Sequence, residues 1–125
     1  MPKRILVVDD DPDLVSVLEA RLKTNGYEVR GVSDAVMVVE VARAFNPDLI
    51  MLDLMLPGGD GLVVLKRLWM IPSVKNIPVV VLTGVRDEGY KKKILEAGVS
   101  AYVEKPYDVE DLLSKIRGIL GESIV

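Results

Sequence analysis

Five polar side chains stand where short apolar segments of the chain end, and their types are those that metal-assisted chemistry uses. They are three aspartates, a threonine and a lysine: Asp9, Asp10, Asp53, Thr83 and Lys105. If they converged, the carboxylates would offer hard oxygen ligands to a divalent cation. The cation and the ammonium group would neutralise phosphoryl oxygens, while one carboxylate could serve as a nucleophile. The set therefore indicates phosphoryl-transfer chemistry.

The charge of such a cluster favours a bound metal ion. Three adjacent carboxylates repel one another unless some of them are protonated or a cation lies between them. One lysine and one divalent ion together balance the charge of three aspartates. A small set of oxygen ligands that leaves room for water suits Mg²⁺ better than Ca²⁺. We therefore expect Mg²⁺ as the cofactor.

Convergence requires a particular fold, and the apolar pattern predicts it. Four short runs rich in branched residues have the length and composition of buried parallel strands, namely residues 5–8, 49–52, 79–82 and 101–103. Residues 27–32 interleave charged and apolar side chains, which is typical of an edge strand.

Each predicted strand is followed by a segment with apolar residues at helical spacing. Capping signals mark the helix boundaries: Asp11–Pro12 and Asp108 at starts, and Gly26, Asn46–Pro47 and Gly98 at ends. Five strand–helix units predict an α/β fold, a doubly wound parallel sheet of order 2-1-3-4-5 with five helices, as in flavodoxin-like proteins. We expect one domain over residues 1–125, with its last helix ending near Leu120. Strands 1 and 3 would then be neighbours, which brings Asp9, Asp10 and Asp53 to one crevice.

Composition excludes several other kinds of site. The chain has no cysteine and no histidine, so thiolate nucleophiles, Cys-bound zinc, Ser-His-Asp catalysis and imidazole metal ligands are ruled out. The net charge of −3 disfavours a nucleic-acid surface. Only four strongly apolar residues precede the first aspartates, which fits neither a signal peptide nor a membrane span. We expect a cytoplasmic protein without direct nucleic-acid or membrane binding.

Taken singly, each polar residue also has a plainer interpretation. Asp9 and Asp10 could be turn residues, and Asp53 could be a turn aspartate before residues 57–59. Thr83 could be a loop hydroxyl, and Lys105 could be a solvated lysine. The agreement of four strand ends is what favours a shared site.

The motifs as a set resemble the receiver domain of two-component response regulators. The matching stretches are ILVVDDDP at 5–12, DLIMLDLMLP at 48–57, Asp60–Gly61, VVLTG at 80–84, Ala97–Gly98 and AYVEKP at 101–106. They cover nearly the whole chain and are highly specific in combination.

The resemblance implies roles for the acidic residues. Asp53 would accept the phosphoryl group. Asp10 and Asp53 would bind Mg²⁺ directly, together with the backbone carbonyl of Met55, whereas Asp9 would act mainly through water. The chain would catalyse only its own phosphorylation and dephosphorylation, and would be no enzyme in the usual sense.

The resemblance also implies how phosphorylation would be sensed. Lys105 would contact the phosphoryl oxygens, and its bond to Pro106 would be cis. Thr83, followed by Gly84, would hydrogen-bond the phosphoryl group, and Tyr102 would move inward behind it. From the residues alone, Tyr102 could equally be a core side chain.

The implied partners are proteins. A histidine kinase or a phosphotransfer protein would supply the phosphoryl group, and a small phosphodonor could replace either. The face formed by the fourth helix, the fifth strand and the fifth helix would meet a downstream target, with the chain a monomer or a phosphorylation-dependent dimer. Ser100 and Ala101 stand where family members with winged-helix output domains often have an acidic pair used in dimer contacts, which puts that dimer mode in doubt. We expect no output domain within the 125 residues, as in a stand-alone receiver or an excised one.

Three other readings are open. The Asp-x-Asp pattern of Asp9–Asp11 resembles a haloacid-dehalogenase-type phosphatase with Asp9 as nucleophile, but a 125-residue chain with short loops has no cap domain, and we find no clear second acidic pair of that type late in the chain. A flavin protein would share the strand order, but an acidic first loop without a glycine-rich motif would repel phosphate. A structural module with a decayed pocket is disfavoured because all five pocket side chains are present.

Overall fold

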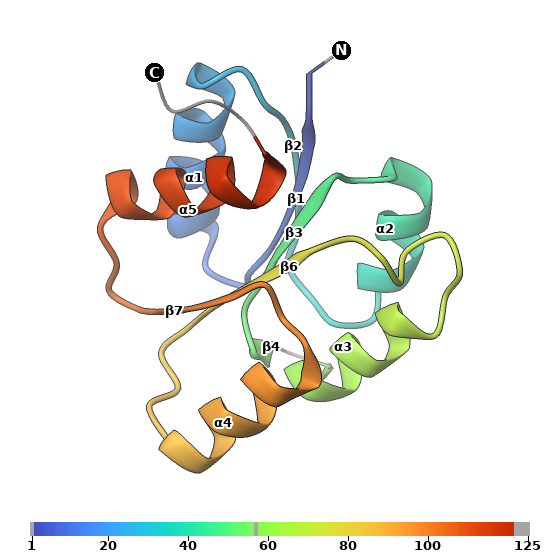
Figure 1. Ribbon diagram of the computed structural model, residues 1–125. Helices are drawn as coiled ribbons and strands as arrows, with labels where there is room; N and C mark the ends of the chain where they lie inside the picture. The colour runs from blue at the N-terminus through green and yellow to red at the C-terminus, as the bar shows by residue number, and fades with distance from the viewer. Residues whose placement is uncertain (1, 57, 122–125) are drawn as a thin grey trace.

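The computed structural model describes residues 2–56 and 58–121, which form a parallel sheet flanked by helices (Figure 1). The elements in chain order are β1 (Arg4–Val8), α1 (Pro12–Thr24), β2 (Glu28–Val32), α2 (Val38–Phe45), β3 (Leu49–Leu52), β4 (Met55–Leu56), β5 (Gly59–Asp60), α3 (Gly61–Trp69), β6 (Val79–Thr83), α4 (Glu88–Ala97), β7 (Ala101–Glu104) and α5 (Val109–Leu120). The five-stranded sheet has the order β2-β1-β3-β6-β7. Counted along that sheet alone, this is the predicted order 2-1-3-4-5, and the predicted doubly wound α/β fold is confirmed.

The helices cover both faces of the sheet, so the central strands are buried on both sides. Helices α1 and α5 pack on one face, and α2, α3 and α4 pack on the other (Figure 1). Successive residues of a strand point to opposite faces. In β1, Ile5 and Val7 therefore join the core under α1 and α5, whereas Leu6 and Val8 join the core under α2 and α3. This two-sided burial is why the strands are continuous apolar runs.

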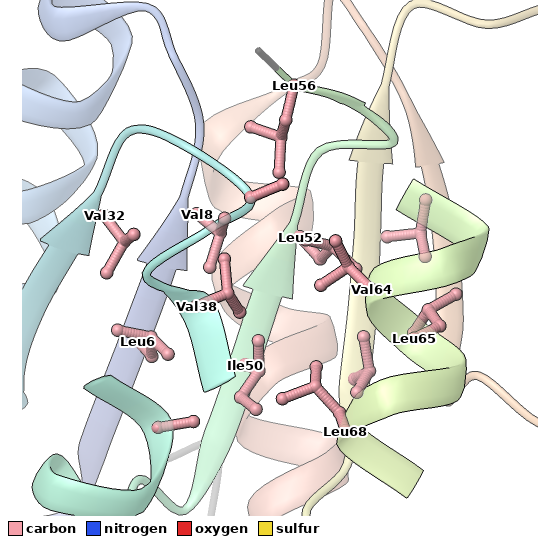
Figure 2. Packing of buried hydrophobic residues seen from close by; sticks show 14 of the residues in the cluster. Leu6, Val8, Val32, Val38, Ile50, Leu52, Leu56, Val64, Leu65 and Leu68 are labelled. Atoms are coloured by element: carbon pink, nitrogen blue, oxygen red, sulfur yellow. The ribbon is translucent and has the colours of Figure 1, made fainter. Parts of the chain in front are cut away.

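The core under α2 and α3 lies directly beneath the ends of β1 and β3, where Asp9 and Asp53 follow. Figure 2 shows Val8 of β1 and Leu52 of β3 packed with side chains from α2 and α3. Val8 and Leu52 are almost fully buried, and each is the last residue before a site aspartate. A close-packed layer of this kind holds the strand ends in fixed positions.

The predicted caps are formed. The Asp11 side chain accepts hydrogen bonds from the amides of Asp13 and Leu14, with Pro12 opening α1. Asp108 caps α5, which ends at Leu120 as predicted. Helix ends are marked by left-handed residues at Gly26, Asn46 and Gly98. The predicted stub after α5 largely falls at residues 122–125, outside the described part of the chain.

The short strands β4 and β5 are not predicted by the sequence pattern. They pair antiparallel between β3 and α3, with Met55 opposite Asp60 and Leu56 opposite Gly59. Two-residue strands carry no alternation, so periodicity cannot reveal them. The Gly61 amide donates to the Leu54 carbonyl at 3.0 Å, which closes this hairpin against the segment that follows Asp53.

None of the helices in residues 2–56 and 58–121 combines the length and the apolar character that a membrane span needs.

Candidate functional site

Backbone hydrogen bonds place the two most deeply buried aspartates side by side. Val8 and Leu52 are partners in the β1–β3 pairing, and Asp9 and Asp53 follow them directly. The Asp53 amide donates to the Val8 carbonyl at 2.9 Å, and the Asp9 amide donates to the Val32 carbonyl at 3.0 Å. The convergence expected from the strand order is therefore produced by the sheet itself.

Three carboxylates form one cluster at this edge. The carboxylate oxygens of Asp9, Asp10 and Asp53 include a set within 4.8 Å of one another. Asp9 and Asp53 are only 3% and 5% exposed, whereas Asp10 is exposed to solvent. The donor set consists of hard oxygens with an open side, which fits a divalent cation that retains water ligands.

Lys105 joins the two buried carboxylates. Its Nζ lies 2.7 Å from Asp9 Oδ2 and 3.0 Å from Asp53 Oδ2. Burial alone would lower the pKa of Lys105, but its hydrogen bonds and attraction to Asp9 and Asp53 outweigh burial, and the net effect raises the pKa above its ordinary value. Lys105 is therefore a cation at neutral pH and offsets part of the charge of the cluster.

The remaining carboxylate oxygens are held by nearby backbone amides. Asp9 Oδ1 accepts a hydrogen bond from the Asp11 amide at 2.9 Å, and Asp53 Oδ1 accepts one from the Met55 amide at 3.0 Å. Each buried carboxylate thus has one oxygen on the backbone and one on Lys105. This arrangement fixes the orientation of both groups, which is what a positioned nucleophile requires.

Thr83 and Tyr102 meet at Val85, in the loop between β6 and α4. Thr83 is fully buried, and its Oγ1 accepts a hydrogen bond from the Val85 amide at 3.2 Å. The Thr83 hydroxyl can still donate its own proton to an incoming group. The Tyr102 hydroxyl donates to the Val85 carbonyl at 2.9 Å. A Cβ on Gly84 would meet nothing within 4 Å, so packing does not demand glycine there.

The bond between Lys105 and Pro106 is cis, as the resemblance implied.

A cavity of about 790 Å³ opens beside the cluster. Its lining residues are the apolar residues 54–56 and Val85, together with Tyr90, Asp10, Asp60 and Asp87. The Tyr90 hydroxyl donates to Asp60 Oδ1 at 3.1 Å, and burial together with this bond raises the pKa of Tyr90 to about 12. Neither Asp87 nor Tyr90 was predicted from the sequence to lie at the site. The Asp87 cap pattern signals only a helix start.

Comparison with known proteins decides the family. The family model described as response regulator receiver domain matches residues 5–117. The chain belongs to this family. Receiver domains act in two-component signalling. The match therefore confirms the resemblance to a receiver domain and gives no support to a haloacid-dehalogenase-type phosphatase.

Individual relatives agree with the family match. The chain is 38% identical over 117 residues to RpaA of Synechocystis sp., described as a DNA-binding dual master transcriptional regulator. That alignment covers 94% of this chain and 48% of RpaA, so this receiver spans about half the length of that relative.

Two solved receiver structures share the fold closely. The beryllofluoride-activated receiver domain of RstA from Klebsiella pneumoniae has a TM-score of 0.87 and 30% identity, over 94% of this chain and 98% of that one. The Mn²⁺-bound response regulator Rcp1 has a TM-score of 0.79 and 33% identity, over 94% and 91% of the two chains.

Proposed function

We propose that this receiver domain accepts a phosphoryl group on Asp53 in a Mg²⁺-dependent reaction. The arrangement of groups around Asp53 supports this function. Its carboxylate is buried, oriented by the Met55 amide and Lys105, and clustered with Asp9 and the exposed Asp10. This combination supplies a positioned nucleophile, an ammonium group and a place for a divalent cation.

Each residue has a part in the proposed reaction. A carboxylate oxygen of Asp53 attacks phosphorus while the bond from phosphorus to the leaving group breaks, which yields an acyl phosphate. Asp9, Asp10, Asp53 and the Met55 carbonyl would hold Mg²⁺, which when bound neutralises phosphoryl oxygens. Lys105, already hydrogen-bonded to Asp53, can transfer a hydrogen bond to a phosphoryl oxygen.

The proposed output begins at Thr83. A phosphoryl group on Asp53 would attract the Thr83 hydroxyl, and Thr83 and Tyr102 both hydrogen-bond Val85. A shift of Thr83 would therefore reach Tyr102 and the face formed by α4, β7 and α5. We propose that this face binds a downstream protein or a second copy of the chain, and that a cytoplasmic histidine kinase or phosphotransfer protein donates the phosphoryl group.

Intact mass spectrometry tests the proposal. The wild-type protein is incubated with a small phosphodonor, with Mg²⁺ or with a chelator, and the modified peptide is then mapped. We expect one phosphate adduct that requires Mg²⁺ and maps to the peptide containing Asp53. An adduct on Asp9, or steady hydrolysis of a chromogenic phosphomonoester, would contradict the proposal and favour the phosphatase reading.

We further expect a slowly hydrolysed phosphoryl group. Met55 and Val85 line the cavity beside Asp10, and neither side chain can orient a water molecule. Replacing both with polar residues, as in Met55→Asn with Val85→Glu, should shorten the half-life of the adduct by about tenfold or more, since a group that orients or activates water accelerates hydrolysis strongly. Mass spectrometry after donor removal measures the decay.

Met70→Asn is the control for this experiment, because Met70 lies at the end of α3 and is 80% exposed. An unchanged half-life in the double variant would show that these two side chains do not limit hydrolysis.

A further inference from the structure

Arg86, in the loop between β6 and α4, contacts the end of β7. The function proposed above assigns no role to this side chain. The Arg86 guanidinium donates from Nη2 to the Lys105 carbonyl at 2.9 Å. Its Nη1 lies 3.6 Å from Glu104 Oε2. The other oxygen of Glu104 lies 3.4 Å from Lys91 Nζ on α4. Arg86 therefore reaches the two residues that end and follow β7.

The backbone amide and the backbone carbonyl of Lys105 both hydrogen-bond to the same short segment, residues 83–86. The Lys105 amide donates to the Thr83 carbonyl at 2.8 Å, and the Lys105 carbonyl accepts from Arg86, three residues after Thr83. Lys105 lies beyond the last residue of β7, so regular strand pairing does not continue past it. The bond from Arg86 thus fixes the backbone from which the Lys105 side chain reaches Asp9 and Asp53.

The two interactions of Arg86 differ in strength. The Arg86 side chain is 64% exposed, so its ion pair with Glu104 contributes little by itself. The bond to the Lys105 carbonyl is charge-assisted and directional, and charge-assisted hydrogen bonds are stronger than neutral ones. The planar guanidinium can make both contacts at once, which a lysine could not do with the same geometry.

We propose that Arg86 is a positioning residue for phosphoryl binding, which holds the Lys105 backbone so that the Lys105 ammonium and the Thr83 hydroxyl approach the phosphoryl group together. This inference rests on the proposed function of Asp53 and adds a residue that touches neither the metal site nor the phosphoryl group. It assigns the β6–α4 loop a second role, that of keeping Lys105 in place.

Binding of beryllofluoride, a phosphoryl analogue, tests the inference separately from binding of Mg²⁺. Affinities for Mg²⁺ alone and for beryllofluoride in saturating Mg²⁺ are measured by NMR titration of the wild type and of Arg86→Gln. We expect Arg86→Gln to weaken beryllofluoride binding by about threefold to tenfold, the worth of one hydrogen bond. Mg²⁺ affinity should not fall, because the Lys105 ammonium is itself a cation on the Asp9 and Asp53 carboxylates, and loosening it removes positive charge from the site of a divalent cation. A general loss of structure would weaken both.

Two further variants test whether the effect comes from the hydrogen bond to the Lys105 carbonyl. Lys91→Gln removes the other cation on Glu104 without touching the Lys105 carbonyl, and should bind beryllofluoride like the wild type. Arg86→Lys keeps a positively charged donor group, without the planar fork of the guanidinium, and should recover part of the affinity. Wild-type affinity in Arg86→Gln, or equal weakening of Mg²⁺ and beryllofluoride binding, would overturn the inference while leaving Asp53 as acceptor. Failure of the wild type to bind beryllofluoride would instead reject the proposed function, and the inference with it.

Discussion

Asp53→Asn is expected to carry no phosphate adduct under conditions in which the wild type is converted. An amide nitrogen and a neutral carbonyl oxygen replace a carboxylate, so the nucleophile is lost. The amide oxygen can still accept the hydrogen bond from Met55, and Lys105 keeps its bond to Asp9, so the variant should fold. Intact mass after incubation with a small phosphodonor and Mg²⁺ measures the difference.

Asp11→Asn is the matched control for this loss. It makes the same change of charge two residues from Asp9, and asparagine caps a helix as well as aspartate does. Asp11 lies outside the three-carboxylate cluster, so its variant should be phosphorylated like the wild type. An adduct that persists in Asp53→Asn would place the nucleophile elsewhere in the cluster, with Asp9 the first residue to test.

Gly61→Ala is expected to destabilise the fold by about 3 kcal/mol, since forcing an atom into a filled space displaces backbone. A Cβ at Gly61 would stand 2.4 Å from Leu54 Cα and 2.8 Å from the Leu54 carbonyl oxygen. Both contacts are far too short, and both are with backbone atoms, which cannot rotate away as a side chain can. Leu54 follows Asp53 directly, so the variant should also bind Mg²⁺ more weakly. Urea unfolding and a Mg²⁺ titration measure the two effects.

Gly118→Ala is the control for the unfolding experiment. It lies in α5, where a Cβ would meet nothing within 4 Å. Alanine is favoured over glycine inside a helix, so this variant should be more stable than the wild type by about 0.5–1 kcal/mol. Equal stability of Gly61→Ala and the wild type would mean that the β4–β5 hairpin adjusts at little cost.

Much of the fold follows from local patterns in the chain. The apolar runs at β1, β3 and β6 identify buried strands, and Asp11, Asp108 and Gly98 mark helix boundaries through interactions within a few residues. Such signals are readable because a cap or a strand face depends on near neighbours. We did not predict the β4–β5 hairpin or the close approach of Gly61 to Leu54 from the sequence, because contacts between loop backbones produce no periodic pattern of residue types.

The residue types establish which chemistry is available to this receiver domain: carboxylates, a lysine and a threonine at strand ends, with no histidine or cysteine. How these side chains act together depends on contacts that form only in the folded chain. It places Lys105 between Asp9 and Asp53, residues 96 and 52 positions away along the chain. It also joins Arg86 to the Lys105 carbonyl. Contacts over such separations depend on sheet register and on the packing of loops over the strand ends, and residue spacing along the chain does not encode either of these locally.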